Sequence, residues 1–137
     1  MRVLSSLREL EISLRDWERY QQYSFEDLKK DRDKRNMILH VMLVSIQSAL
    51  DISSYLISEN GLKRPETYRE TFDLLGQSGT ISEELAAELS DLAGFRNVLV
   101  HVYWDLNLDE IYSILQNDLK TLRSFKDNIK ELLIKVK

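Results

Sequence analysis

Residues 37–57, MILHVMLVSIQSALDISSYLI, are apolar on most sides of a helix, and this stretch decides the fold. A helix that is apolar nearly all round belongs either in the middle of a large helical core or in a membrane. The longest uninterrupted apolar run, residues 41–44, is far shorter than the ~20 residues that a membrane span requires. The stretch therefore predicts a central helix that other helices of the same chain cover.

Signals on both sides of this stretch set the ends of the central helix at about residues 25–60. Ser24 and Asp27 form a capping-box pattern at its start, and Gly61 follows it as a natural C-cap. A helix of this length would measure ~54 Å, which is long for one domain, so the prediction allows a kink near Arg35.

Apolar residues recur at helical spacing in four further segments, and no stretch of strict alternation reaches the length of a strand. The segments are residues 3–22, a short helix from Pro65 that GQSG ends, a helix from Thr80 or Ser82 into residues 94–105, and residues 108–136 after Asn107. We predict a single all-α domain over residues 1–137, an up-and-down four-helix bundle with one additional short helix.

The composition excludes several classes of site. The chain has 137 residues, no cysteine and a formal net charge of −4, so it has no disulfide, no thiol nucleophile and no cysteine-type zinc site. The acidic balance does not favour nucleic acid, so an RNA-binding surface must be local or assembled from two chains. Glu9 and Glu11 stand where a signal peptide would be apolar. We expect a cytoplasmic protein without membrane contact.

Residues 94–105, GFRNVLVHVYWD, bring reactive side chains to the end of a helix. At about 100° per residue, we expect a core side with Val98, Leu99 and Val102, and a second side with Arg96, Asn97, His101 and Trp104. Tyr103 falls almost under Arg96, Asn97 lies one turn before His101, and Gly94 allows another backbone to come close. Because the second side mixes polar and apolar side chains, we predict that it forms an interface that contains a functional site.

The residue types in this stretch limit its chemistry. A neutral histidine moves protons near pH 7, and an arginine holds a phosphate and stabilises charge that develops on it. The sequence offers no cluster of metal ligands and no glycine-rich phosphate loop. Arginine and histidine without a metal favour cleavage of RNA, whose own 2′-hydroxyl is the nucleophile. Taken singly, each of these residues is more often a packing or hydrogen-bonding residue.

Two polar residues of the central helix are further candidates. Asp51 lies in an apolar half-helix, where a carboxylate is costly unless it is paired. It either supports Arg96 or His101, or makes a structural ion pair or helix contact, and both interpretations stay open. His40 is interpreted as a core or interface residue, and the charged run KKDRDKR as a solvated helix face.

The sequence FRNVLVHVYWDLNLDEIY, residues 95–112, resembles the signature of the HepT-like ribonuclease toxins of the HEPN superfamily. That signature is an arginine, four residues, a histidine, one residue and a tyrosine, which Arg96, His101 and Tyr103 match. Asn97 matches the polar residue that usually follows the arginine. Residues 49–85 resemble the middle segment of the family, and the order of helices agrees over nearly the whole chain.

The resemblance implies a metal-independent endoribonuclease toxin that acts as a homodimer with a composite cleft. It implies that Arg96 binds the scissile phosphate, that His101 does acid–base work and that Asn97 supports them. It also implies an MntA-like nucleotidyltransferase antitoxin, which uses ATP to attach AMP to Tyr103, so that the toxin itself needs no cofactor. The substrate would be RNA, with tRNA among the candidates.

Two other interpretations stay open. The acidic charge and the lack of a clear basic patch favour a catalytically silent dimeric scaffold that binds a nucleotide or a nucleotidyltransferase partner. A plain structural four-helix oligomer would use Arg96 and Tyr103 only for stability.

Overall fold

The computed structural model describes residues 2–101 and 106–136, and the side chains of residues 3–99 and 106–134. Within these ranges every regular element is a helix, so the predicted all-α class is confirmed. The helices are α1 (Arg2–Tyr20), α2 (Phe25–Lys30), α3 (Arg32–Glu59), α4 (Tyr68–Gln77), α5 (Glu83–His101), α6 (Leu108–Asn117) and α7 (Leu119–Val136).

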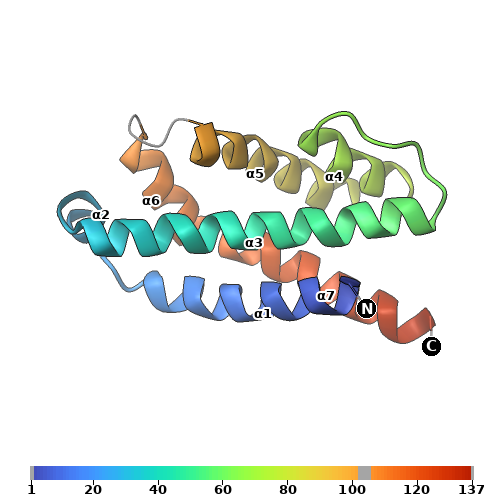
Figure 1. Cartoon of the computed structure of the whole chain (residues 1–137), viewed down its shortest axis with the longest axis horizontal. Helices are drawn as coiled ribbons and strands as arrows, with labels where there is room; N and C mark the ends of the chain where they lie inside the picture. Colours follow the sequence, from blue (N-terminus) through green and yellow to red (C-terminus); the bar gives the residue numbers. More distant parts are fainter. Residues whose placement is uncertain (1, 102–105, 137) are drawn as a thin grey trace.

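Helix α3 is the central element, as the sequence predicts. Figure 1 shows it along the middle of the molecule, with α1 and α7 on one side and α4 and α5 on the other, and α3 contacts each of them. It is the one helix of the described chain that is long and apolar enough to cross a membrane by length and composition, but 61% of that window is buried inside the protein. Most of its apolar surface is therefore covered by the neighbouring helices.

The core contains the apolar positions that the helical spacing picks out. The α1 seam of Leu7, Leu10, Leu14 and Trp17 is buried, and Phe72 of α4 meets Phe125 of α7 edge to face, with ring centroids 6.1 Å apart. Burying one such side chain contributes roughly 1.5–3 kcal/mol. This core fixes the relative positions of α3, α4 and α5, which carry the candidate site.

The helix predicted over residues 25–60 is two helices, because the chain turns at Asp31 rather than bending near Arg35. Asp31 has φ −99° and ψ 104°, and its N–H donates to the carbonyl of Asp27 at the end of α2. Its side chain accepts from the N–H of Lys34 and so begins α3. One aspartate therefore serves as the C-cap of one helix and the N-cap of the next.

The helix predicted over residues 108–136 is also divided, at Asp118. Just before the break, the carbonyl of Leu115 accepts hydrogen bonds from Trp17 Nε1 at 2.9 Å and from Gln21 Nε2 at 3.0 Å. Two side-chain donors, one in α1 and one directly after it, thus engage the backbone where the helix is interrupted, and helical spacing does not reveal such tertiary contacts. The predicted cap at Asn107 is confirmed, since its side chain accepts from the N–H of Glu110.

The connection between α3 and α4 is longer than predicted, because α4 begins at Tyr68 and not at Pro65. Gly61 ends α3 with φ 64°, a backbone conformation that suits glycine. The N–H groups of Gly61 and Leu62 donate to Ser58 and Ile57, which is the bonding pattern of a Schellman cap. Thr67 then caps α4. Residues between these two caps form one wall of the cleft described below.

Candidate functional site

Arg96 lies on the buried face of α5. Leu85, Leu89 and Leu92 are buried there, and on an ideal helix they lie within about 40° of Arg96. The prediction that put Val98 on the core side is wrong, because Val98 lies about 160° from Arg96 and is 38% exposed. Leu99 is buried as predicted, and Val102 lies outside the described residues.

The guanidinium of Arg96 is half-buried between α3 and α4. Its Nε donates to Gln47 Oε1 at 3.1 Å, and its Cζ lies 4.5 Å from the centroid of the Tyr68 ring. A planar cation over an aromatic ring gains about 0.5–2 kcal/mol, depending on its exposure. The two contacts hold the guanidinium in one place at the end of the core.

Asp51 is connected to Arg96 through Gln47 rather than by direct contact. Gln47 Nε2 donates to Asp51 Oδ1 at 3.0 Å, while its Oε1 accepts from Arg96. The expectation of a buried carboxylate is wrong, since Asp51 is exposed on the outer side of α3. The amide of Gln47 is thus oriented from both ends. Sequence reasoning missed Gln47, although its place one turn before Asp51 was a usable signal.

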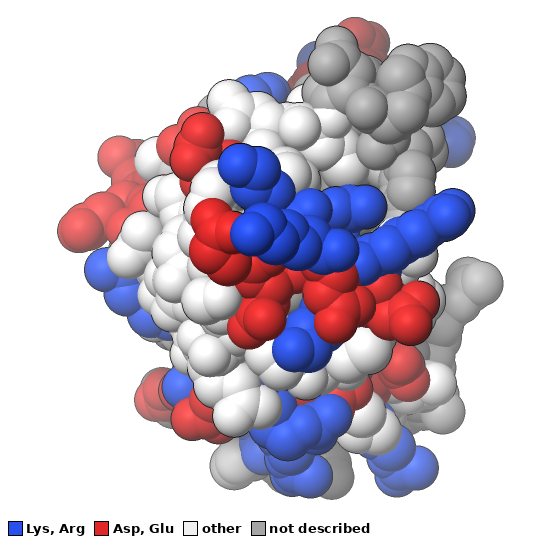
Figure 2. All heavy atoms as spheres, turned by 90° about the vertical axis from the view of Figure 1, so that its left-hand side faces the viewer, with Lys and Arg blue, Asp and Glu red and all other residues white. Residues whose placement is uncertain are grey.

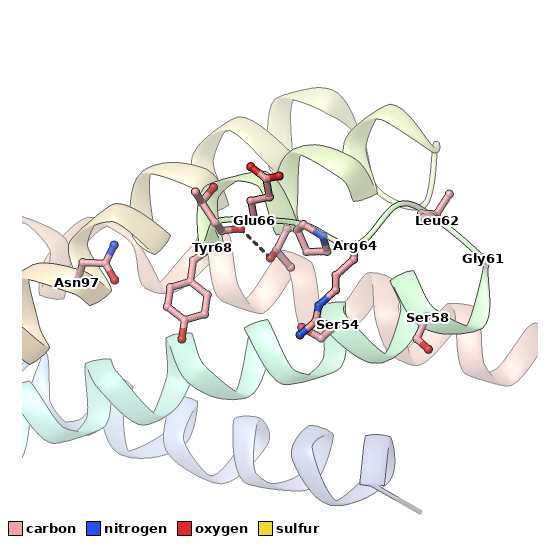
Figure 3. A pocket seen from close by; sticks show the side chains of 11 residues that line it. Ser54, Ser58, Gly61, Leu62, Arg64, Glu66, Tyr68 and Asn97 are labelled. Atoms are coloured by element: carbon pink, nitrogen blue, oxygen red, sulfur yellow. Dashed lines mark hydrogen bonds between the residues drawn. The ribbon is translucent and has the colours of Figure 1, made fainter.

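Asn97 is exposed and reaches a cleft of ≈ 970 Å³ beside Arg96. Figure 3 shows this cleft between α3, the 61–67 connection and the start of α4. The side chain of His101 and all of Tyr103 and Trp104 lie outside what the structure describes, so their predicted roles stay predictions. The structure brings together Arg96, Asn97 and the outer surface of α3. Asp51 does not contact Arg96 directly, because Gln47 lies between them.

Gly94 differs from its predicted setting, and His40 fits only the interface alternative of the two settings predicted for it. Gly94 allows a close approach, but the group over it is the guanidinium of Arg69 and not another backbone. Arg69 also pairs with Asp91 on the far side of α5 from Gln47. His40 is exposed, so it is not a core residue of the isolated chain.

Charges of opposite sign alternate at the α2 end of the molecule. Figure 2 shows lysine and arginine beside aspartate and glutamate on this face, and ion pairs join Lys30 to Glu26 and Lys34 to Asp27. The backbone of Ser24 lowers the pKa of Asp27. The run KKDRDKR lies at the surface as predicted, but it is not the face of one helix, because the turn at Asp31 divides it between α2 and α3. Among the described residues, no group of three His, Asp or Glu side chains could hold a metal ion.

The chain matches the sequence model of one protein family over most of its length. The family is described as "Ribonuclease HepT-like", and the match covers residues 10–129. The chain belongs to this family of ribonucleases. The predicted family and, at the level of the family, the predicted class of RNA-cleaving enzyme are confirmed.

Two relatives illustrate the range within the family. The chain is 29% identical over 102 residues to the "mRNA nuclease HepT" of Shewanella oneidensis, which covers 74% of this chain and 77% of the relative. It is 23% identical over 116 residues to the "tRNA nuclease HepT" of Aphanizomenon flos-aquae, which covers 85% of this chain and 79% of that relative.

A solved structure has the same fold. The tri-AMPylated Shewanella oneidensis HEPN toxin, determined in complex with its MNT antitoxin, superposes with a TM-score of 0.85 at 23% identity. The superposition covers 94% of this chain and 96% of that one. The predicted HEPN-like bundle is therefore confirmed.

Proposed function

We propose that the protein is the endoribonuclease toxin of a toxin–antitoxin pair, with a cleavage site built on Arg96 and His101. The observation that carries this proposal is the half-buried guanidinium of Arg96, fixed by Gln47 and Tyr68 at the point where the core face of α5 changes from leucine to arginine. Membership of the HepT-like ribonucleases and the names of the two relatives support it.

In the proposed reaction, Arg96 binds the scissile phosphate. Its Nε is turned toward Gln47, so the terminal amino groups are the donors that a phosphate would engage. His101 takes the proton of the 2′-hydroxyl, whose oxygen attacks phosphorus while the bond to the 5′-oxygen breaks. The products are a 2′,3′-cyclic phosphate and a 5′-hydroxyl, and the leaving oxygen receives a proton. The substrate supplies the nucleophile, so the proposal includes no metal ion and no cofactor.

Gln47, Asp51 and Asn97 are positioning residues in this proposal. Gln47 orients the guanidinium, and Asp51 orients the amide of Gln47 through its hydrogen bond to Nε2. Asn97 precedes His101 by one helical turn, and side chains at this spacing on a helix are neighbours, so we assign to its amide the orientation of the imidazole. Each acts through Arg96 or His101, so its loss is expected to cost less than the loss of the group that it orients.

We further propose a homodimer in which two copies of this surface face each other. Met37 is 39% exposed, and His40 lies on the same exposed stripe of α3 as Asp51, which gives this stripe the mixed character of an interface. A second copy of the stripe would place two sets of Arg96 and His101 in one cleft, where one histidine serves as base and the other as acid.

The proposed partner is a nucleotidyltransferase antitoxin of the MntA type that uses ATP to attach AMP to Tyr103. The resemblance of Arg96, His101 and Tyr103 to the family signature supports this, as does the tri-AMPylated state of the Shewanella toxin in its complex. AMP near Arg96 would add negative charge and bulk where RNA binds. The proposed location is the cytoplasm, where both RNA and ATP are available.

The test is cleavage of total RNA and of tRNA by the purified protein in EDTA. Removing one preorganised donor to a developing anion costs about 10²–10³-fold in rate, and this is the loss expected for Arg96→Ala. His101→Ala is expected to lose at least as much. Arg69→Ala is the matched control, because Arg69 lies on the opposite side of α5 and pairs with Asp91. Equal cleavage by wild type, Arg96→Ala and His101→Ala would reject the assigned site.

A silent dimeric scaffold is the second candidate, and the net charge of −4 favours it. If the wild type cuts no RNA but binds a nucleotide or a nucleotidyltransferase tightly, this candidate replaces the first.

A further inference from the structure

The cleft beside Arg96 has a wall of polar side chains from three segments of the chain. Figure 3 shows Ser54 and Ser58 on α3, Arg64 on the connection, Tyr68 at the start of α4 and Asn97 on α5 around it. Its volume, ≈ 970 Å³, is at the upper end of the range of about 300–1,000 Å³ that small-molecule sites occupy. The cleft is therefore large enough for a nucleotide.

The chemistry of the lining suits a phosphate and a sugar better than an apolar ligand. Hydroxyl groups come from Ser54, Ser58, Thr67 and Thr71, and an amide comes from Asn97. Arg64 is the one cation among the described lining residues, and in Figure 3 its side chain extends toward Ser54 on α3. The one carboxylate of this lining, Glu66, is directed away from α3 in the same view. An anion could thus reach Arg64 from the α3 side without meeting Glu66.

Tyr68 belongs both to this cleft and to the Arg96 site. Its ring lies against the guanidinium of Arg96, with 4.5 Å between Cζ and the ring centroid, and the residue also lines the cleft. Tyr68 is 38% exposed, so part of its surface is available to a ligand. Aromatic side chains of this kind stack with bases that have left the helical stack of RNA. One ring therefore connects a phosphate site at Arg96 with a base site in the cleft.

We propose that the cleft binds the nucleotide next to the scissile phosphate of a single-stranded RNA substrate. Arg64 holds the phosphate of that nucleotide, Tyr68 stacks with its base, and the hydroxyl-bearing residues and Asn97 contact its sugar and base edges. This inference rests on the proposed function, because it takes Arg96 as the residue that binds the scissile phosphate. It adds a substrate-binding residue, Arg64, that lies outside the segment of the family signature.

Binding can be measured without cleavage by placing every variant in a His101→Ala background. Fluorescence anisotropy with a labelled single-stranded RNA compares this parent chain with the same chain carrying Arg64→Ala. Lys63→Ala is the matched control, because Lys63 is exposed, carries the same charge and does not line the cleft. Arg64 is exposed on a connection between helices, so Arg64→Ala is expected to fold, and a thermal melt verifies this.

The expected result is binding about tenfold weaker for Arg64→Ala, which corresponds to one lost charged hydrogen bond. Lys63→Ala is expected to stay within about twofold, because an exposed charge outside the cleft contributes little. The logarithm of the association constant decreases as the logarithm of the salt concentration rises. For Arg64→Ala the steepness of this decrease should be smaller by about 0.7, the value for one phosphate contact on a single strand. Equal weakening by both substitutions, or by neither, would overturn the inference.

Cleavage by the chain with His101 intact separates this outcome from the proposed function. If that chain cuts RNA while Arg64→Ala and Lys63→Ala bind alike, the cleft assignment fails and the proposed function stands. If that chain cuts no RNA but Arg64→Ala alone weakens binding, the cleft is a nucleotide site and the proposed ribonuclease function fails.

Discussion

The two halves of α5 use the same face of one helix for different purposes. In the first half, Leu85, Leu89 and Leu92 bury this face in the core, and Leu89 is 0% exposed. In the second half, the position that continues this row is Arg96, whose guanidinium is half-buried. The backbone geometry is the same in both halves, so the change from scaffold to site depends on the side chain alone.

The second half tolerates a charge because its neighbours are suited to one. A half-buried cation loses part of its hydration and needs partners in return. Gln47 supplies an acceptor oxygen and Tyr68 supplies an aromatic face. Neither of these partners is an anion, so among the described residues the positive charge of Arg96 is not neutralised and is available to a phosphate. A carboxylate in place of Gln47 would hold the guanidinium more tightly and compete with the substrate.

The largest effect on stability is expected in the first half, at Leu89. Leu89→Ala should lower the free energy of unfolding by about 2–5 kcal/mol, because it removes buried methyl groups and leaves a cavity. Urea denaturation followed by circular dichroism measures this. The fraction that remains folded should keep the cleavage rate of the wild type. A loss below about 1 kcal/mol would show that the first half is not the tightly packed half that its burial indicates.

A smaller effect of opposite sign is expected for Arg96→Leu, which continues the leucine row into the second half. Replacing a half-buried charge by an apolar side chain should leave stability unchanged or raise it by up to about 1 kcal/mol. The same variant should lose RNA cleavage as Arg96→Ala does. The measurement pairs a urea titration with the cleavage assay. A destabilisation of 2 kcal/mol or more, on the scale of a core truncation, would mean that Arg96 is part of the scaffold.

The smallest effect concerns the outer side of the first half, where Glu88 and Asp91 lie near Asp118. Partial burial, then the charge of Glu88, raises the pKa of Asp118 above its ordinary value of 3.8. Relative to the unfolded chain, folding therefore favours the protonated form of Asp118. The stability that follows from this shift is present below about pH 4 and is lost as pH rises through the folded-state pKa.

Asp118→Asn tests that effect, because asparagine stays neutral at all these pH values. The variant should be slightly more stable than the wild type at pH 7, and the difference should shrink as pH falls toward 3. Thermal melts of both proteins across this range measure it. A difference of the same size at pH 3 and pH 7 would show that the charge of Asp118 is not its cause.

Local capping signals predicted several helix ends correctly, but the start of α4 and the breaks within two predicted helices were missed. Ser24, Asn107 and Gly61 act within a few residues of their own position, and all three cap helices as predicted. The break at Asp118 coincides with hydrogen bonds from Trp17 of α1 and from Gln21, directly after α1, to the carbonyl of Leu115. Spacing within one helix carries no information about donors that another helix supplies.

In the candidate site, too, some residues could be predicted from a local sequence pattern and others could not. The signature of Arg96, His101 and Tyr103 is a pattern within one helix-sized segment, so the sequence by itself determined the family, the fold class and the residues proposed for chemistry. Only the tertiary structure decided that Arg96 faces Gln47 and Tyr68 and that a polar cleft with Arg64 opens beside it. The physical reason is distance along the chain: Arg96 and Gln47 are 49 positions apart, and only the packing of α5 against α3 and α4 brings such side chains together.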